Sequence, residues 1–148
     1  MIFKVLITSL ILGLLAPSAQ ASSQIIVVTN HSAYLPKISY TTLYKYLKIV
    51  NSHYDTYQGV YWIYLDDHLP STVLFPFHSL GGHTKDVRAY INVKGSLDVG
   101  LDPYLVITHE LAEMAVNPHL LTTNEIADEA TNSFVIQGHV VSGFREKV

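Results

Sequence analysis

The chain of 148 residues contains no cysteine, no cluster of basic residues and only one long apolar run. The lack of cysteine excludes disulfides, thiolate metal ligands and a lipoprotein-type cysteine anchor. The net charge is −3 with histidine neutral, and the nine lysines and arginines are scattered along the sequence. Because no basic surface is encoded for a phosphate backbone, nucleic acid is not expected as a partner.

The single long apolar run, residues 5–16, follows Lys4 and ends at Pro17. It is shorter than the roughly 20 residues that a membrane-spanning helix needs. Ala19 and Ala21 place small residues at the two positions that a signal peptidase reads. The pattern predicts a secretory signal peptide over residues 1–21 and a single domain over residues 22–148. We therefore expect an exported protein, periplasmic or secreted, with no stable membrane anchor after cleavage.

The spacing of apolar residues along the rest of the chain predicts an α+β fold, a small mixed β-sheet with helices packed on it. Runs rich in β-branched and aromatic residues are typical of strands, whereas apolar residues three and four positions apart are typical of amphipathic helices. Strands are predicted over residues 24–29, 60–65 and 87–93, and helices over residues 38–51 and 103–116.

The segments between and after these elements carry turn signals or weaker periodicity. Prolines and glycines predict loops over residues 66–86 and 95–100. Thr122 or Thr123 is a suitable N-cap for a second late helix that reaches about Asn132. The last part of the chain predicts a hairpin or a loose tail.

The segment with the most chemical information is Thr-His-Glu-Leu-Ala-Glu at residues 108–113. On a helix His109 and Glu113 project from the same face, so an imidazole and a carboxylate can each bind one divalent metal ion. Glu110 lies beside that pair and can take a proton from a water molecule, as the general base does in metal-assisted hydrolysis. Burying such charged residues in an apolar helix costs free energy unless they coordinate a metal or form pairs.

A catalytic zinc site usually has three protein ligands and one open position. Glu125 and Asp128 lie one turn apart on the predicted late helix, and both approach the site if that helix folds back on the first. We assign Glu125 as the third ligand and Asp128 as the partner of the free ring nitrogen of His109. The reverse assignment stays open, and His119, in the turn between the helices, is an alternative ligand.

The pattern of residues 108–111 followed by residues 124–128 resembles that of thermolysin-like zinc metallopeptidases, in which His-Glu-Leu is followed by a turn and then by Asn-Glu. It is more similar to the motif of secreted HExxE proteins of the zincin-like kind. These include the plant exordium-like (phosphate-induced) proteins and bacterial relatives. The likeness covers residues 105–145 and leaves out the N-terminal half.

This resemblance implies a zincin-like active-site helix and a bound zinc ion. It implies that His109 and Glu113 coordinate the zinc together with one residue of the Glu125/Asp128 pair, and that Glu110 is the base. The chain differs from thermolysin-like enzymes at Glu113, where those enzymes have a second histidine, and it is smaller than a typical peptidase.

The sequence thus predicts an exported zinc-dependent hydrolase, a peptidase that acts on a peptide or protein substrate. One alternative is a non-catalytic exported binding module that retains the zincin-like fold, and another is a metal-free helix with a solvated acidic face. His68, His78 and His83 fall in the predicted loop over residues 66–86, and we expect them to be exposed without a function.

Overall fold

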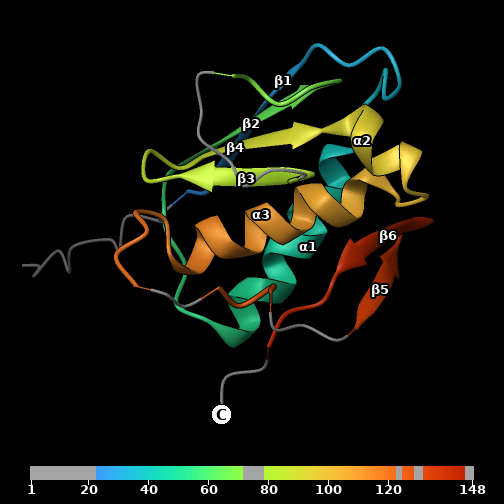
Figure 1. Cartoon of the computed structure of the whole chain (residues 1–148). Coiled ribbons are helices and arrows are strands. Elements are labelled where there is room, and N and C mark those ends of the chain that lie inside the picture. The colour runs from blue at the N-terminus through green and yellow to red at the C-terminus, as the bar shows by residue number, and fades with distance from the viewer. Residues whose placement is uncertain (1–22, 72–78, 123–124, 129–131, 146–148) are drawn as a thin grey trace, which may run out of the picture.

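The computed structural model describes residues 23–71, 79–122, 125–128 and 132–145. Within these residues it has a four-stranded mixed sheet, a two-stranded antiparallel sheet and three helices (Figure 1), which confirms the predicted α+β class. No helix in this part of the chain is long and apolar enough to cross a membrane. The elements are β1 (Ile25–Asn30), α1 (Tyr40–His53), β2 (Val60–Asp66), β3 (Gly81–Thr84), β4 (Arg88–Asn92), α2 (Val93–Asp98), α3 (Pro103–Val116), β5 (Ser133–Ile136) and β6 (His139–Ser142).

The larger sheet has the strand order β1-β2-β4-β3, and the edge strand β3 runs antiparallel to the other three. Helix α1 connects β1 to the parallel strand β2, and α1 and α3 lie on the same side of the sheet (Figure 1). Along β2, Tyr61, Ile63 and Leu65 are buried in the core, whereas Trp62 between them is exposed. This alternation shows that the helices cover one face of the sheet.

Helix α3 lies at the centre of the molecule, between the sheet, α1 and the β5-β6 hairpin (Figure 1). Asp102 caps its N-terminus by accepting a hydrogen bond from the backbone N–H of Tyr104 at 2.9 Å, and Pro103 occupies its first turn. Its core-facing apolar side chains include Ile107, Leu111 and Met114. Because neighbours surround α3, the two glutamates on it, Glu110 and Glu113, are buried.

The prediction of a loop over residues 66–86 is wrong at its end, where β3 pairs with β4. Strand β3 packs so closely on α3 that a Cβ atom at Gly81 would lie 2.8 Å from Cγ1 of Val106. Glycine therefore lets the strand approach the helix. Its low strand propensity also conceals the strand from a prediction based on sequence pattern.

Two other predicted segments differ from the structure. The turn expected over residues 95–100 overlaps α2, which Asn92 caps by accepting a hydrogen bond from the N–H of Gly95 at 2.8 Å. The helix expected from Thr122 or Thr123 is absent over residues 125–128, which form a turn. There Ile126 is buried, and its carbonyl accepts a hydrogen bond from the N–H of Arg145 at 2.8 Å. A tertiary contact thus replaces the helical pairing that local sequence favours.

The terminal hairpin is confirmed by the pairing of β5 with β6. The predicted signal peptide, residues 1–21, lies outside the described residues.

Asp102 also links α3 to the hairpin, because its second carboxylate oxygen accepts a hydrogen bond from the N–H of Val140 at 2.9 Å. Asp102→Ala removes the cap and this link, and we expect it to lower the free energy of unfolding by about 1–2 kcal/mol. Asp102→Asn keeps a capping acceptor and should cost less. Urea unfolding measures both losses.

A matched control is Asp98→Ala, which removes an exposed carboxylate paired with Lys94 on α2. Exposed pairs contribute about 0–1 kcal/mol. A loss for Asp102→Ala no larger than that for Asp98→Ala would contradict the linking role of Asp102.

Candidate metal centre

A hollow of about 790 Å³ opens between α3, β3 and the turn at residues 125–128. The side chains of α3 that line it are His109, Glu110 and Glu113. The apolar positions of the helix determine this orientation, because they bury the opposite side of α3 in the core. His83, Glu125 and Asp128 also line the hollow, close to these three side chains.

His109 lies between two carboxylates. Its Nε2 atom is 3.3 Å from Oε1 of Glu113, one helical turn along α3, and 3.1 Å from Oδ1 of Asp128. The Glu113 side chain is only 5% exposed, whereas Asp128 is largely exposed at the rim. The imidazole and the two carboxylates therefore converge, although Asp128 lies on a turn beyond the end of α3.

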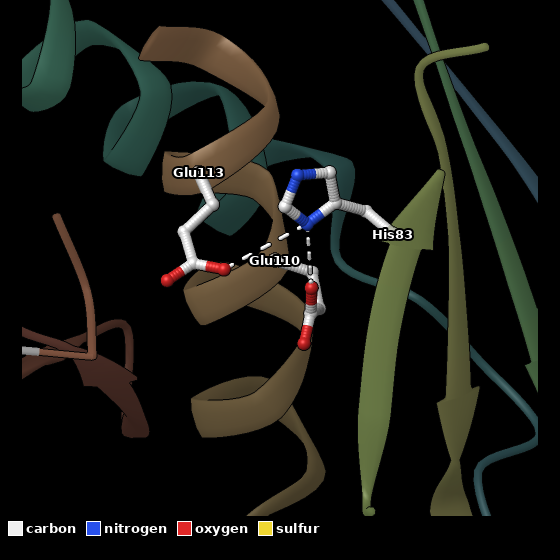
Figure 2. Close-up of side chains that lie close together, drawn as sticks. All are labelled: His83, Glu110 and Glu113. Carbon is white, nitrogen blue, oxygen red and sulfur yellow. Dashed lines mark hydrogen bonds and ion pairs between the residues drawn. The ribbon is translucent and has the colours of Figure 1, made fainter. Parts of the chain in front are cut away.

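His83 on the edge strand β3 approaches the same helix from the other side. Its Nδ1 atom hydrogen-bonds Oε2 of Glu110 at 3.0 Å and lies 3.7 Å from Oε2 of Glu113. Figure 2 shows the imidazole reaching from the strand to the two glutamates of α3, with Nδ1 directed at both carboxylates. The His83 side chain is 4% exposed, so this contact is buried.

The close carboxylates change the pKa values of their neighbours. Burial lowers the pKa of His109, but the hydrogen bond and charge of Glu113 outweigh this and raise it to about 9. Burial also lowers the pKa of His83, and the contact with Glu110 more than offsets it, so the net shift is upward. Burial and the neighbouring carboxylate of Glu113 raise the pKa of Glu125 to about 7. At Glu113 burial also raises the pKa, but the hydrogen bond and charge of His109 have the larger effect, so the pKa of Glu113 is lowered. Protons therefore partly neutralise the crowded carboxylates when no cation is present.

Two buried polar atoms at this place have no hydrogen-bond partner in the protein, Nε2 of His83 and Oε2 of Glu125. Oε1 of Glu113 has only the imidazole of His109 near it, at 3.3 Å. Buried polar atoms without a partner are costly, and a cation can satisfy carboxylate oxygens that no donor reaches.

Two groups of residues in the described part of the chain could hold a metal ion. One is His83 with Glu110 and Glu113, and the other is His109 with Glu113 and Asp128. In each group the ligand atoms lie within 4.8 Å of one another. Imidazole nitrogen and carboxylate oxygen are donors that several divalent metals accept, so the geometry indicates a cation site without selecting the metal.

Four of the five residues expected at the site lie close together in the structure. It brings His109, Glu113 and Asp128 together, with Glu110 buried beside them. Glu125, the expected third ligand, lines the hollow close enough to Glu113 to influence its pKa but belongs to neither group.

The alternative ligand His119 also lines the hollow without joining either group, and its Nδ1 atom is bonded to the carbonyl of Lys85 at 2.9 Å.

The expectation that His83 is exposed is wrong. Strand β3, which the sequence pattern conceals, carries it inward against α3. The useful signal would have been its position two residues after Gly81, since side chains at alternate positions of a strand share one face. His78 lies outside the described residues.

These pKa shifts predict a pH dependence for the metal-free protein. The raised pKa of Glu125 stabilises the folded state at low pH, and this contribution is lost as pH rises from 4.5 to about 7. The raised pKa of His109 adds a contribution that is lost between 6.5 and about 9. For the protein freed of metal by a chelator, we expect the melting temperature to fall by roughly 3–6 °C between pH 6.5 and about pH 9. This fall corresponds to a loss of unfolding free energy on the order of 1 kcal/mol.

His109→Gln should remove most of this fall, whereas His31→Gln, at an exposed histidine beside Asp66, should leave it unchanged. A melting temperature of the chelated protein that stays level or rises over the same range would contradict the protonation of His109.

Comparison with protein-family models, with curated proteins and with solved structures finds no significant match. The function is therefore inferred from the chemistry of the hollow itself.

Proposed function

We propose that the protein is an exported zinc-dependent hydrolase, a peptidase with a zincin-like active-site helix. The observation that carries this proposal is the convergence of His109, Glu113 and Asp128 on one side of the hollow. Glu110 is buried on the same helix next to Glu113. One imidazole and two carboxylates are a donor set that suits zinc, and three protein ligands leave a coordination position open.

The distances support Asp128 as the third ligand rather than Glu125. Its Oδ1 atom already lies 3.1 Å from Nε2 of His109, and zinc ligands in contact with one ion lie about 3–4 Å from one another. Glu125 lines the hollow outside this group, and its hydrogen bond helps to lower the pKa of Glu113. This is the reverse of the assignment that the sequence favoured.

Glu110 is the residue that we assign as general base. A bound zinc ion lowers the pKa of a water molecule and polarises a substrate carbonyl. Glu110 would accept the proton of the attacking water and pass it to the leaving amine. His83 holds the carboxylate in place through its Nδ1 hydrogen bond.

The size of the hollow is consistent with a peptide segment as substrate. Its volume of about 790 Å³ falls within the range of ligand sites. The rim includes Leu120, an exposed apolar residue that can contact an apolar substrate side chain. Export follows from the sequence pattern of residues 1–21, and removal of that segment would leave the domain described above.

Zinc binding is tested by thermal unfolding of the purified protein after chelation and after zinc addition. At a free zinc concentration about 100 times the dissociation constant, zinc should stabilise the protein by about 2.7 kcal/mol. His109→Ala should lose the greater part of this gain. His119→Ala, in the same hollow but outside both ligand groups, should keep it. No stabilisation of the wild-type protein by zinc would refute the metal centre.

Hydrolysis is tested with Glu110→Gln and a quenched fluorescent peptide library. The variant should retain zinc at His109 but cleave about 10²–10⁴ times more slowly, because the base is lost. Asp86→Asn, at an exposed carboxylate in the turn between β3 and β4, should cleave like the wild type. If the zinc-loaded wild type cleaves no member of the library, the peptidase assignment fails and the exported binding module takes its place.

A further inference from the structure

We infer that the hollow binds two divalent cations, the second one held by His83, Glu110 and Glu113, with Glu113 shared between the two. This inference rests on the proposed function for its first cation, which His109, Glu113 and Asp128 hold. The second site adds a residue, His83, that the hydrolase proposal uses only to position Glu110.

The position of Glu113 is the first argument. Its two carboxylate oxygens face different histidines, because Oε1 lies 3.3 Å from Nε2 of His109 and Oε2 lies 3.7 Å from Nδ1 of His83. A carboxylate with one oxygen toward each of two nitrogen ligands has the geometry of a bridge between neighbouring cations. The two candidate metal groups share this one residue.

The burial of the second group is the next argument. His83 and Glu113 have side chains only 4% and 5% exposed. A solvated acidic surface would not bury its carboxylates in this way, since desolvation of an ionised carboxylate is expensive. In Figure 2 a single nitrogen of the His83 imidazole faces one carboxylate oxygen of Glu110 and one of Glu113.

The charge of the hollow also favours two cations. Four carboxylates line it, from Glu110, Glu113, Glu125 and Asp128. Two divalent cations balance four carboxylates while both histidines stay neutral, as metal ligands must. A single divalent cation would leave two negative charges to be balanced, and the lysine that lines the hollow, Lys85, is exposed in the turn after β3.

The chemistry that follows is that of two-metal hydrolysis. Two cations about 3.5–4 Å apart stabilise negative charge that develops on the attacking and leaving groups. Glu110 would contribute Oε2, the oxygen that faces His83, and keep Oε1 to accept the proton. The second cation therefore adds positive charge without removing the base.

The test is the zinc stoichiometry of the chelated and reloaded protein, measured by native mass spectrometry. Wild type should bind two zinc ions, His83→Ala one and His109→Ala no more than one. His119→Ala is the matched control and should bind two. X-ray absorption of the loaded wild type should show a metal–metal distance of about 3.5–4 Å, a result that needs no variant to fold.

The outcomes separate the two proposals. One zinc in wild type and in His83→Ala, with none in His109→Ala, overturns the second site and leaves the proposed function intact. Two zinc ions in His83→Ala, or no metal–metal scattering in the wild type, also overturn it. No zinc in wild type refutes both proposals together.

Discussion

The burial of two carboxylates on the central helix is the constraint on which the rest of the structure depends. Glu110 and Glu113 are 5% and 4% exposed, and the other buried residues of their helix are almost all apolar. Charges in such a place need compensation of several kcal/mol. Two histidines supply it, His83 from β3 and His109 from α3 itself. The edge strand and the turn at residues 125–128 are therefore parts of one polar centre inside an otherwise apolar protein.

One side of α3 packs in the hydrophobic core, and the other side lines the hollow. The face of the sheet that bears Tyr61, Ile63 and Leu65 and the apolar side of α3 belong to one hydrophobic core. The opposite side of α3 faces the hollow, where Gly81 lets the strand come close and place His83 beside the glutamates. Two regular elements, α3 and β3, thus carry most of the side chains that could bind a metal, whereas Asp128 lies on a turn at the rim.

Sequence reasoning was most successful where local patterns decide the structure. The cap at Asp102, the first-turn Pro103 and the spacing of His109, Glu110 and Glu113 depend on one helix, and the structure places all of them as expected. It failed where distant contacts decide. His83 enters the centre only because β3 pairs with β4. Asp128 is the expected partner of His109, but it lies on a turn and not on the predicted late helix. The glycines of β3 have low strand propensity, so the sequence pattern did not predict the position of His83.

In the proposed function His109, Glu113 and Asp128 bind one and the same metal ion. The most direct measurement is a crystal structure of the zinc-loaded protein with anomalous diffraction recorded at the zinc absorption edge. A peak in the hollow with Nε2 of His109 and one oxygen each of Glu113 and Asp128 at about 2.0–2.2 Å is the predicted result. An ordered hollow without an anomalous peak at these three side chains would contradict it.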